Sequence, residues 1–159
     1  MEKPAEAEHR CDEGEYLPIR AYAIIGDCRT AALISDSGSI DWYCPERFDA
    51  PAIFCRLLDA HRGGYWRLAP AAHFQTERHY LGGTNVLRTV FIGNGFRFRL
   101  TDLMPIGNQP IDTPSANAIS QFQILRLLEV LDGEAELEMA FKVTFDYGKE
   151  PATYYTVGD

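Results

Sequence analysis

Residues 135–145 read AELEMAFKVTF, and this stretch decides the fold class. Apolar side chains occupy every second position from Ala135 to Phe145, with Glu, Ala, Lys or Thr between them. Successive side chains of a β-strand point to opposite faces of a sheet, so the alternation predicts a strand with one buried face. Such a strand needs a partner. The adjacent candidate is the apolar run 121–131, because Asp132-Gly133 between the two is typical of a hairpin turn.

Short apolar runs separated by turn residues cover most of the remaining chain. They are residues 22–25, 31–34, 40–43, 65–69, 74–80, 85–92 and 96–101. Asp36-Ser37-Gly38 and Asn94-Gly95 favour tight turns between neighbouring runs, since these residues tolerate the dihedral angles that hairpins require. The first three runs therefore predict a β-meander. In the last run, apolar residues alternate with Arg97, Arg99 and Thr101, so we expect one buried face and one that carries arginines.

Residues 50–58 depart from this pattern. Their apolar side chains Ile53, Phe54, Leu57 and Leu58 recur at helical spacing. Asp49 can cap such a segment, a proline follows near its first turn, and two glycines at 63–64 can close it. The sequence thus predicts an all-β fold, an antiparallel two-sheet β-sandwich with one short helix.

Length and charge limit the classes of function. The chain has 159 residues and a formal net charge of -8, and residues 1–15 hold six acidic residues against two basic ones. We therefore expect a flexible acidic leader over 1–15 and one domain over 16–159. No run of Lys or Arg suggests a nucleic-acid partner. No apolar stretch approaches the roughly 18 residues of a membrane helix, and no signal peptide is recognisable, so we expect a cytoplasmic protein.

Neither a metal nor a cofactor is expected from the sequence. Cys11, Cys28, Cys44 and Cys55 lack metal-binding spacing and are interpreted as reduced thiols. The four histidines also lack ligand spacing. Phosphate-binding loops, dinucleotide fingerprints and nucleophile motifs are all missing from the sequence.

The candidate site residues are Asp41, Trp42, Arg47, Phe48 and Asp49. Carboxylates, guanidinium groups and aromatic faces in one segment suit a sugar, whose hydroxyls pair with planar carboxylates and whose C–H faces stack on aromatic rings. A structural interpretation remains open, in which the two aromatic residues are core and Arg47 pairs with a carboxylate.

The two carboxylates of a glycosidase site could come from Asp41 together with Asp49 or Glu46. Such a pair needs a carboxyl separation of roughly 5–9.5 Å, which the sequence does not define. Any domain with 23 acidic residues offers such pairs, so we do not expect catalysis by this chain alone.

Seven sequence blocks, in order along the chain, resemble the N-terminal domain of bacterial and archaeal glycoside hydrolase family 15 proteins, which are glucoamylase-like and trehalase-like enzymes. The blocks are IIGDCRTAAL (24–33), GSIDW (38–42), RFDAP (47–51), GGYWRLAP (63–70), YL with TNVL (80–81 and 84–87), TDLMP (101–105) and FDYG (145–148). They cover nearly all of the expected domain.

This resemblance implies a β-sandwich, a partial "super-sandwich", that precedes a catalytic (α/α)6 barrel. In the family the barrel carries both catalytic glutamates and hydrolyses α-glucosidic bonds with inversion, so we expect no catalytic residue here. The implied function is to support folding and packing of the absent barrel, with Asp41, Trp42, Arg47, Phe48 and Asp49 facing it. Because the surface that faces the barrel would then be exposed, we also expect copies of this chain to associate through it. The alternative is a stand-alone module that binds α-glucans. Residues 154–157 suggest a further strand beginning, and hence a sandwich incomplete at its C-terminal end.

Overall fold

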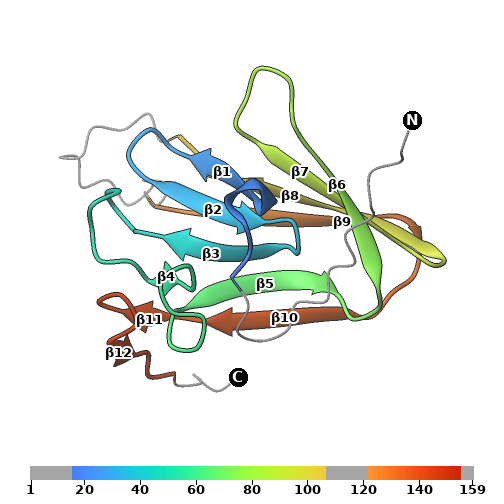
Figure 1. Cartoon of the computed structure of the whole chain (residues 1–159). Coiled ribbons are helices and arrows are strands. Elements are labelled where there is room, and N and C mark those ends of the chain that lie inside the picture. Colours follow the sequence, from blue (N-terminus) through green and yellow to red (C-terminus); the bar gives the residue numbers. More distant parts are fainter. Residues whose placement is uncertain (1–15, 107–121, 155–159) are drawn as a thin grey trace, which may run out of the picture.

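The computed structural model describes residues 16–106 and 122–154, which are almost entirely β-structure (Figure 1). A 3-10 turn, η1 (Ile19–Ala21), is followed by β1 (Tyr22–Gly26), β2 (Ala31–Ser35), β3 (Ser39–Tyr43), β4 (Phe54–Cys55), β5 (Tyr65–Pro70), β6 (Phe74–Tyr80), β7 (Leu87–Gly93), β8 (Phe96–Leu103), β9 (Leu125–Gly133), β10 (Leu137–Lys142), β11 (Thr144–Phe145) and β12 (Glu150–Pro151). The expected leader 1–15 and the residues 155–157 of the expected last strand lie outside the described residues.

The strands form two antiparallel sheets that pack as a sandwich, as predicted. Sheet A has the order β1-β2-β3-β5-β10, with β4 paired to β3, and sheet B has the order β6-β7-β8-β9. In Figure 1 sheet A lies in front of sheet B. The short strands β11 and β12 pair with each other. The meander β1-β2-β3 and the Asn94-Gly95 hairpin between β7 and β8 are confirmed.

The core lies between the two sheets. Strand β8 shows the predicted alternation, because Phe96, Phe98 and Leu100 are buried, whereas Arg97 is exposed. Aromatic rings dominate the packing beside sheet B, and the rings of Phe91 and Phe98 lie 5.5 Å apart. A second cluster of mainly aliphatic side chains continues the core beneath β1–β4.

The predicted helix over 50–58 is wrong. The segment forms bends, the two-residue strand β4 and turns, and the only helix in the described residues is η1. Phe54 pairs with Tyr43 of β3, so hydrogen bonding to sheet A replaces the helical hydrogen bonds. The apolar spacing does not produce one buried face either, since Phe54 is buried and Leu58 is exposed.

The predicted pairing of 121–131 with 135–145 is also wrong. Strand β9 pairs with β8 in sheet B, whereas β10 pairs with β5 in sheet A. Asp132-Gly133 is therefore the end of β9, and the chain crosses from one sheet to the other after it. Gly133 has a φ of 67°, and a Cβ atom at this position would overlap the carbonyl oxygen of Gly95. The glycine that suggested a hairpin turn in fact permits the close approach to the β7–β8 turn.

Candidate functional site

The five candidate residues do not converge on one site. Asp41 lies on β3 as the extra residue of a bulge, because Leu33 pairs with Trp42 and Ile34 pairs with Ile40. Its carboxylate accepts hydrogen bonds from the hydroxyls of Ser39 and of Tyr22, the latter at 2.9 Å. Asp41 is buried, and burial raises the pKa of its carboxyl although both hydrogen bonds lower it. This group is a structural acid enclosed by the sheet.

We expect Asp41→Asn to change how stability depends on pH. The folded chain holds the Asp41 proton more tightly than the unfolded chain, so stability is lost as the pH rises through the raised pKa. An amide keeps hydrogen-bond capacity toward Tyr22 and Ser39 but cannot ionise. Urea unfolding from pH 4 to pH 8 should therefore show the variant gaining stability over the unmodified chain as pH rises. Parallel curves would contradict the assignment.

Arg47, Phe48 and Asp49 lie together in an exposed loop. The Arg47 guanidinium donates two hydrogen bonds of 2.9 Å to the Asp49 carboxylate, and this contact lowers the pKa of Asp49. Phe48 between them is 74% exposed, so the structural interpretation is confirmed for the arginine and wrong for this phenylalanine. Asp41 and Asp49 have separate partners in different surroundings, which gives no support to a glycosidase pair.

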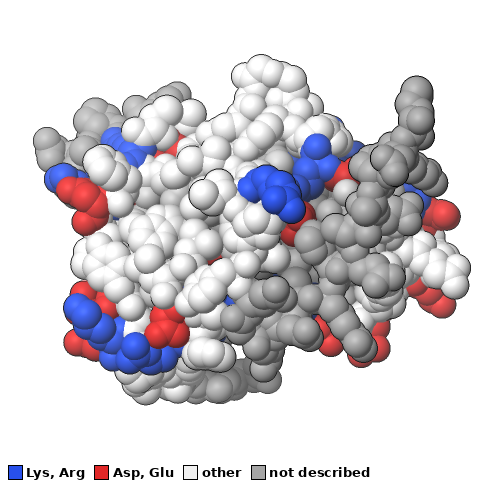
Figure 2. All heavy atoms as spheres, viewed as in Figure 1, with Lys and Arg blue, Asp and Glu red and all other residues white. Residues whose placement is uncertain are grey.

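Trp42 belongs to a different cluster again. Its side chain is partly buried against Cys44, Ala52 and Cys55, and its ring centroid lies 6.5 Å from that of Tyr147. On the face shown in Figure 2, Lys and Arg side chains stand beside Asp and Glu in small separate groups, with uncharged atoms over most of the described surface between them.

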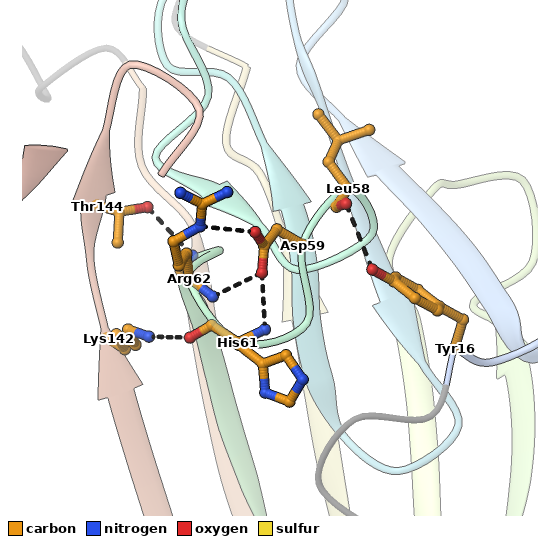
Figure 3. Close-up of polar contacts among 8 residues, drawn as sticks. Tyr16, Leu58, Asp59, His61, Arg62, Lys142 and Thr144 are labelled. Carbon is orange, nitrogen blue, oxygen red and sulfur yellow. Dashed lines mark hydrogen bonds and ion pairs between the residues drawn. The ribbon is translucent and has the colours of Figure 1, made fainter. Parts of the chain in front are cut away.

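The loop after β4 is held to the C-terminal strands by polar contacts (Figure 3). Asp59 accepts hydrogen bonds from the backbone and side chain of Arg62 and from the backbone of His61, which lower the pKa of Asp59 to about 2. Lys142 donates to the carbonyl of His61 at 2.7 Å, and the Thr144 hydroxyl accepts from the Gly64 amide at 3.1 Å. The loop and β10–β11 thus form one unit.

A buried ion pair connects the two sheets. Arg126 of β9 donates to Asp102 of β8 at 2.8 Å, and both side chains are almost fully buried. The same guanidinium donates to the carbonyl of Trp66 in β5 at 2.8 Å and to that of Gly38, in the β2–β3 turn of sheet A, at 2.9 Å. Sequence reasoning missed this pair, because 24 residues separate the partners along the chain and no sequence pattern pairs them.

In the described part of the chain, the sandwich is open between β9 and β10. Leu128 and Val130 pair with the core residues Leu100 and Phe98, so they share the inner face of sheet B. Val130 is nevertheless 66% exposed. In sheet A, Phe141 packs edge-on against the core ring of Phe54 at 5.9 Å and is still exposed.

Met139 has the same orientation as Phe141 two positions along β10, and it is 68% exposed. Strand β9 has no described neighbour beyond β8, and β10 has none beyond β5. In Figure 1, β5 and β10 lie below β9, and no strand of sheet B is drawn behind them. We call Leu128, Val130, Met139 and Phe141, with the free strand edges beside them, the open edge.

Two further observations apply to the described residues alone. Among residues 16–106 and 122–154, no group of three or more His, Cys, Asp or Glu side chains is arranged to hold a metal ion. Within the same ranges, no helix has the length and apolar character needed to span a membrane.

Comparisons with known proteins find relatives of this chain. Residues 12–157 match the family described as "Trehalase-like, N-terminal". The chain is 34% identical to a trehalase of Thermoplasma volcanium over 138 residues, which is 85% of this chain and 21% of the relative. It is 33% identical to a trehalase of Mycolicibacterium smegmatis over 149 residues, which is 87% of this chain and 22% of that protein.

The chain spans about a fifth of the length of these curated relatives. No solved structure matches it. The family match covers most of the sequence, and the observed sandwich is the fold that the sequence blocks implied. The chain therefore belongs to the trehalase-like N-terminal domain family.

Proposed function

We propose that this chain is a non-catalytic domain that supports the folding and packing of the catalytic part of a longer trehalase-like hydrolase. The observation that carries the proposal is the open edge, where apolar side chains of both inner faces meet solvent. Exposed apolar side chains beside unpaired strand edges are typical of a surface that another element covers. The catalytic part, with its sandwich-completing segment, supplies that element.

The proposal includes a sandwich that is incomplete within 16–159. A further segment adds strands to β9 and β10 by main-chain hydrogen bonds and places apolar side chains against Val130 and Met139. The buried Arg126–Asp102 pair supports this view, because it holds β9 at a defined position relative to sheet A before any partner is added.

The chemistry of the whole protein is part of the same proposal. The relatives are named trehalases, and the resemblance to family 15 adds glucoamylase-like activity as the second possibility. In either case the reaction is inverting hydrolysis of an α-glucosidic bond by groups outside this chain. The proposed compartment is the cytoplasm, where free thiols such as those of Cys44 and Cys55 persist.

Self-association of the 159-residue chain tests the open edge. We expect a concentration-dependent dimer in analytical ultracentrifugation, because two copies can cover each other's apolar edge. Val130→Lys should shift the chain to monomer, whereas Leu58→Lys, at another exposed apolar residue, should not. Monomer at high concentration without any substitution, or equal effects of both variants, would oppose the proposal. Glucose release from trehalose or maltooligosaccharides by this chain alone would contradict a non-catalytic role.

A second candidate function is α-glucan binding by the loop of Arg47, Phe48 and Asp49. The specific observation is that an exposed aromatic ring stands beside a planar ion pair. Titration calorimetry with maltoheptaose is expected to show heat that Phe48→Ala removes if this module binds sugar. The absence of heat at millimolar ligand leaves the packing role.

A further inference from the structure

The loop between β6 and β7 is shaped before any partner binds. Its residues close on themselves, with the Leu81 amide donating to the carbonyl of Val86 at 2.9 Å and the Thr84 hydroxyl donating to the carbonyl of Leu81 at 2.8 Å. The Val86 amide donates to the Thr84 hydroxyl in turn. Because these contacts are already made, binding at this loop costs little conformational entropy.

Two side chains attach this loop to the edge strand of sheet A. The Tyr80 hydroxyl donates to the carbonyl of Ile24 at 2.8 Å and accepts from the amide of the same residue at 3.0 Å. The Asn85 amide group donates to the carbonyl of Gly26. The loop projects from the sandwich on the side away from β10 (Figure 1), so it lies apart from the open edge.

An open concavity of about 530 Å³ lies against this loop. Its lining residues share the absence of charge, and they are Tyr80, Leu81, Gly82, Gly83, Thr84, Asn85 and Ile106. We call this set the loop concavity. Ile106 is 63% exposed, and Leu81 and Tyr80 are exposed as well. The Tyr80 hydroxyl contacts the backbone of Ile24 in β1, whose side chain is also exposed.

The chemistry of the loop concavity suits an apolar protein surface. Its three polar side chains already make hydrogen bonds within the chain, so a sugar would lose water without regaining equivalent partners. An apolar side chain would lose no hydrogen bonds and would be stabilised by the burial of apolar surface. A charged ligand would find no opposite charge among the lining residues.

We propose that the loop concavity is a second docking surface, and that its occupant is an apolar patch of the catalytic part of the longer protein. This inference rests on the proposed function and adds a contact apart from the open edge. About four fifths of the length of the relatives lies outside the matched region, which supplies an occupant of sufficient size. The β6–β7 loop is uncharged and preformed, and it lies on the side of the sandwich away from β10. The catalytic part can therefore pack against this loop while a separate segment adds strands to β9 and β10 at the open edge.

Hydrogen–deuterium exchange compares the 159-residue chain with the full-length protein. We expect the amides of residues 81–86 to exchange at least about tenfold more slowly in the full-length protein. Leu81→Asp or Ile106→Asp in the full-length protein should abolish this protection, whereas Leu58→Asp should leave it unchanged. Circular dichroism of each variant checks that the sandwich still folds.

Other outcomes separate this inference from the proposed function. Protection of β9 and β10 in the full-length protein without protection of 81–86 overturns the second docking surface and leaves the proposed function intact. Absence of protection at both places overturns both. Slower exchange of 81–86 in the 159-residue chain on addition of trehalose or maltoheptaose also overturns the inference, because it assigns the loop concavity to a sugar.

Discussion

Arg126→Met is expected to destabilise the chain by about 3–5 kcal/mol, since it leaves the buried carboxylate of Asp102 without its cation. It also removes the hydrogen bonds to the carbonyls of Trp66 and Gly38 that connect the sheets. Urea unfolding at neutral pH, followed by circular dichroism, measures the loss.

The neighbouring pair of the same two strands provides the control. Arg99 of β8 contacts Glu129 of β9 at 2.7 Å on the more exposed outer face. Arg99→Met should therefore cost about 1 kcal/mol or less. Equal effects of the two substitutions would show that burial and the contacts to sheet A do not matter.

The mechanism also predicts a rescue and a pH dependence. Replacing both partners, as in Arg126→Met with Asp102→Leu, should recover much of the stability, because no buried charge is left unpaired. Burial raises the pKa of Asp102, and Arg126 opposes that rise. Without Arg126 the carboxyl should take up a proton more readily, so the Arg126→Met deficit should shrink as the pH is lowered toward 4.

The sequence pattern was sufficient to predict those elements that depend mainly on neighbouring residues in the chain. The alternation in 96–101 and the Asn94-Gly95 turn each depend on neighbours in sequence, and the structure confirms both. The helix over 50–58 failed although apolar spacing, a candidate cap at Asp49 and a proline near the first turn all favoured it. Backbone pairing of Phe54 and Cys55 with β3 overrides that weak local preference.

Long-range pairing was beyond the sequence pattern. The alternation in 135–145 correctly predicts a strand, yet periodicity contains no information about which sheet receives it. Its partner β5 lies far back in the sequence, and the intervening β6–β9 form sheet B. The Arg126–Asp102 pair was hidden for the same reason, because its role depends on carbonyls that only the folded sheets bring together.

The candidate site shows the same limit. Sequence reasoning grouped five residues because they are close along the chain, but β3 takes Asp41 into the sheet while the loop exposes Phe48. The open edge was expected only in general terms, as a consequence of the resemblance. Its residues became identifiable once the register placed Val130 opposite Phe98.

Gly133→Ala is expected to be the most damaging single-methyl change in the described part of the chain. The residue has a φ of 67°, and the added Cβ would meet the carbonyl oxygen of Gly95 in the β7–β8 turn. Neither backbone can yield without disturbing the end of β9, where Gly133 pairs with Phe96. We expect a loss of more than about 3 kcal/mol, as strain and overlap add.

Substitutions at two glycines of the β6–β7 loop separate the cost of backbone strain from the cost of steric overlap. Gly83 has a φ of 74° with open space around its Cβ position, so Gly83→Ala reports backbone strain alone and should cost about 1 kcal/mol. Gly82 has open space and no positive φ, so Gly82→Ala should change stability little or raise it slightly through the unfolded chain. Thermal and urea unfolding should rank the losses as Gly133, then Gly83, then Gly82. If Gly133→Ala cost no more than Gly83→Ala, the chain after β9 could move away from the β7–β8 turn, and the fixed crossover between the two sheets would be wrong.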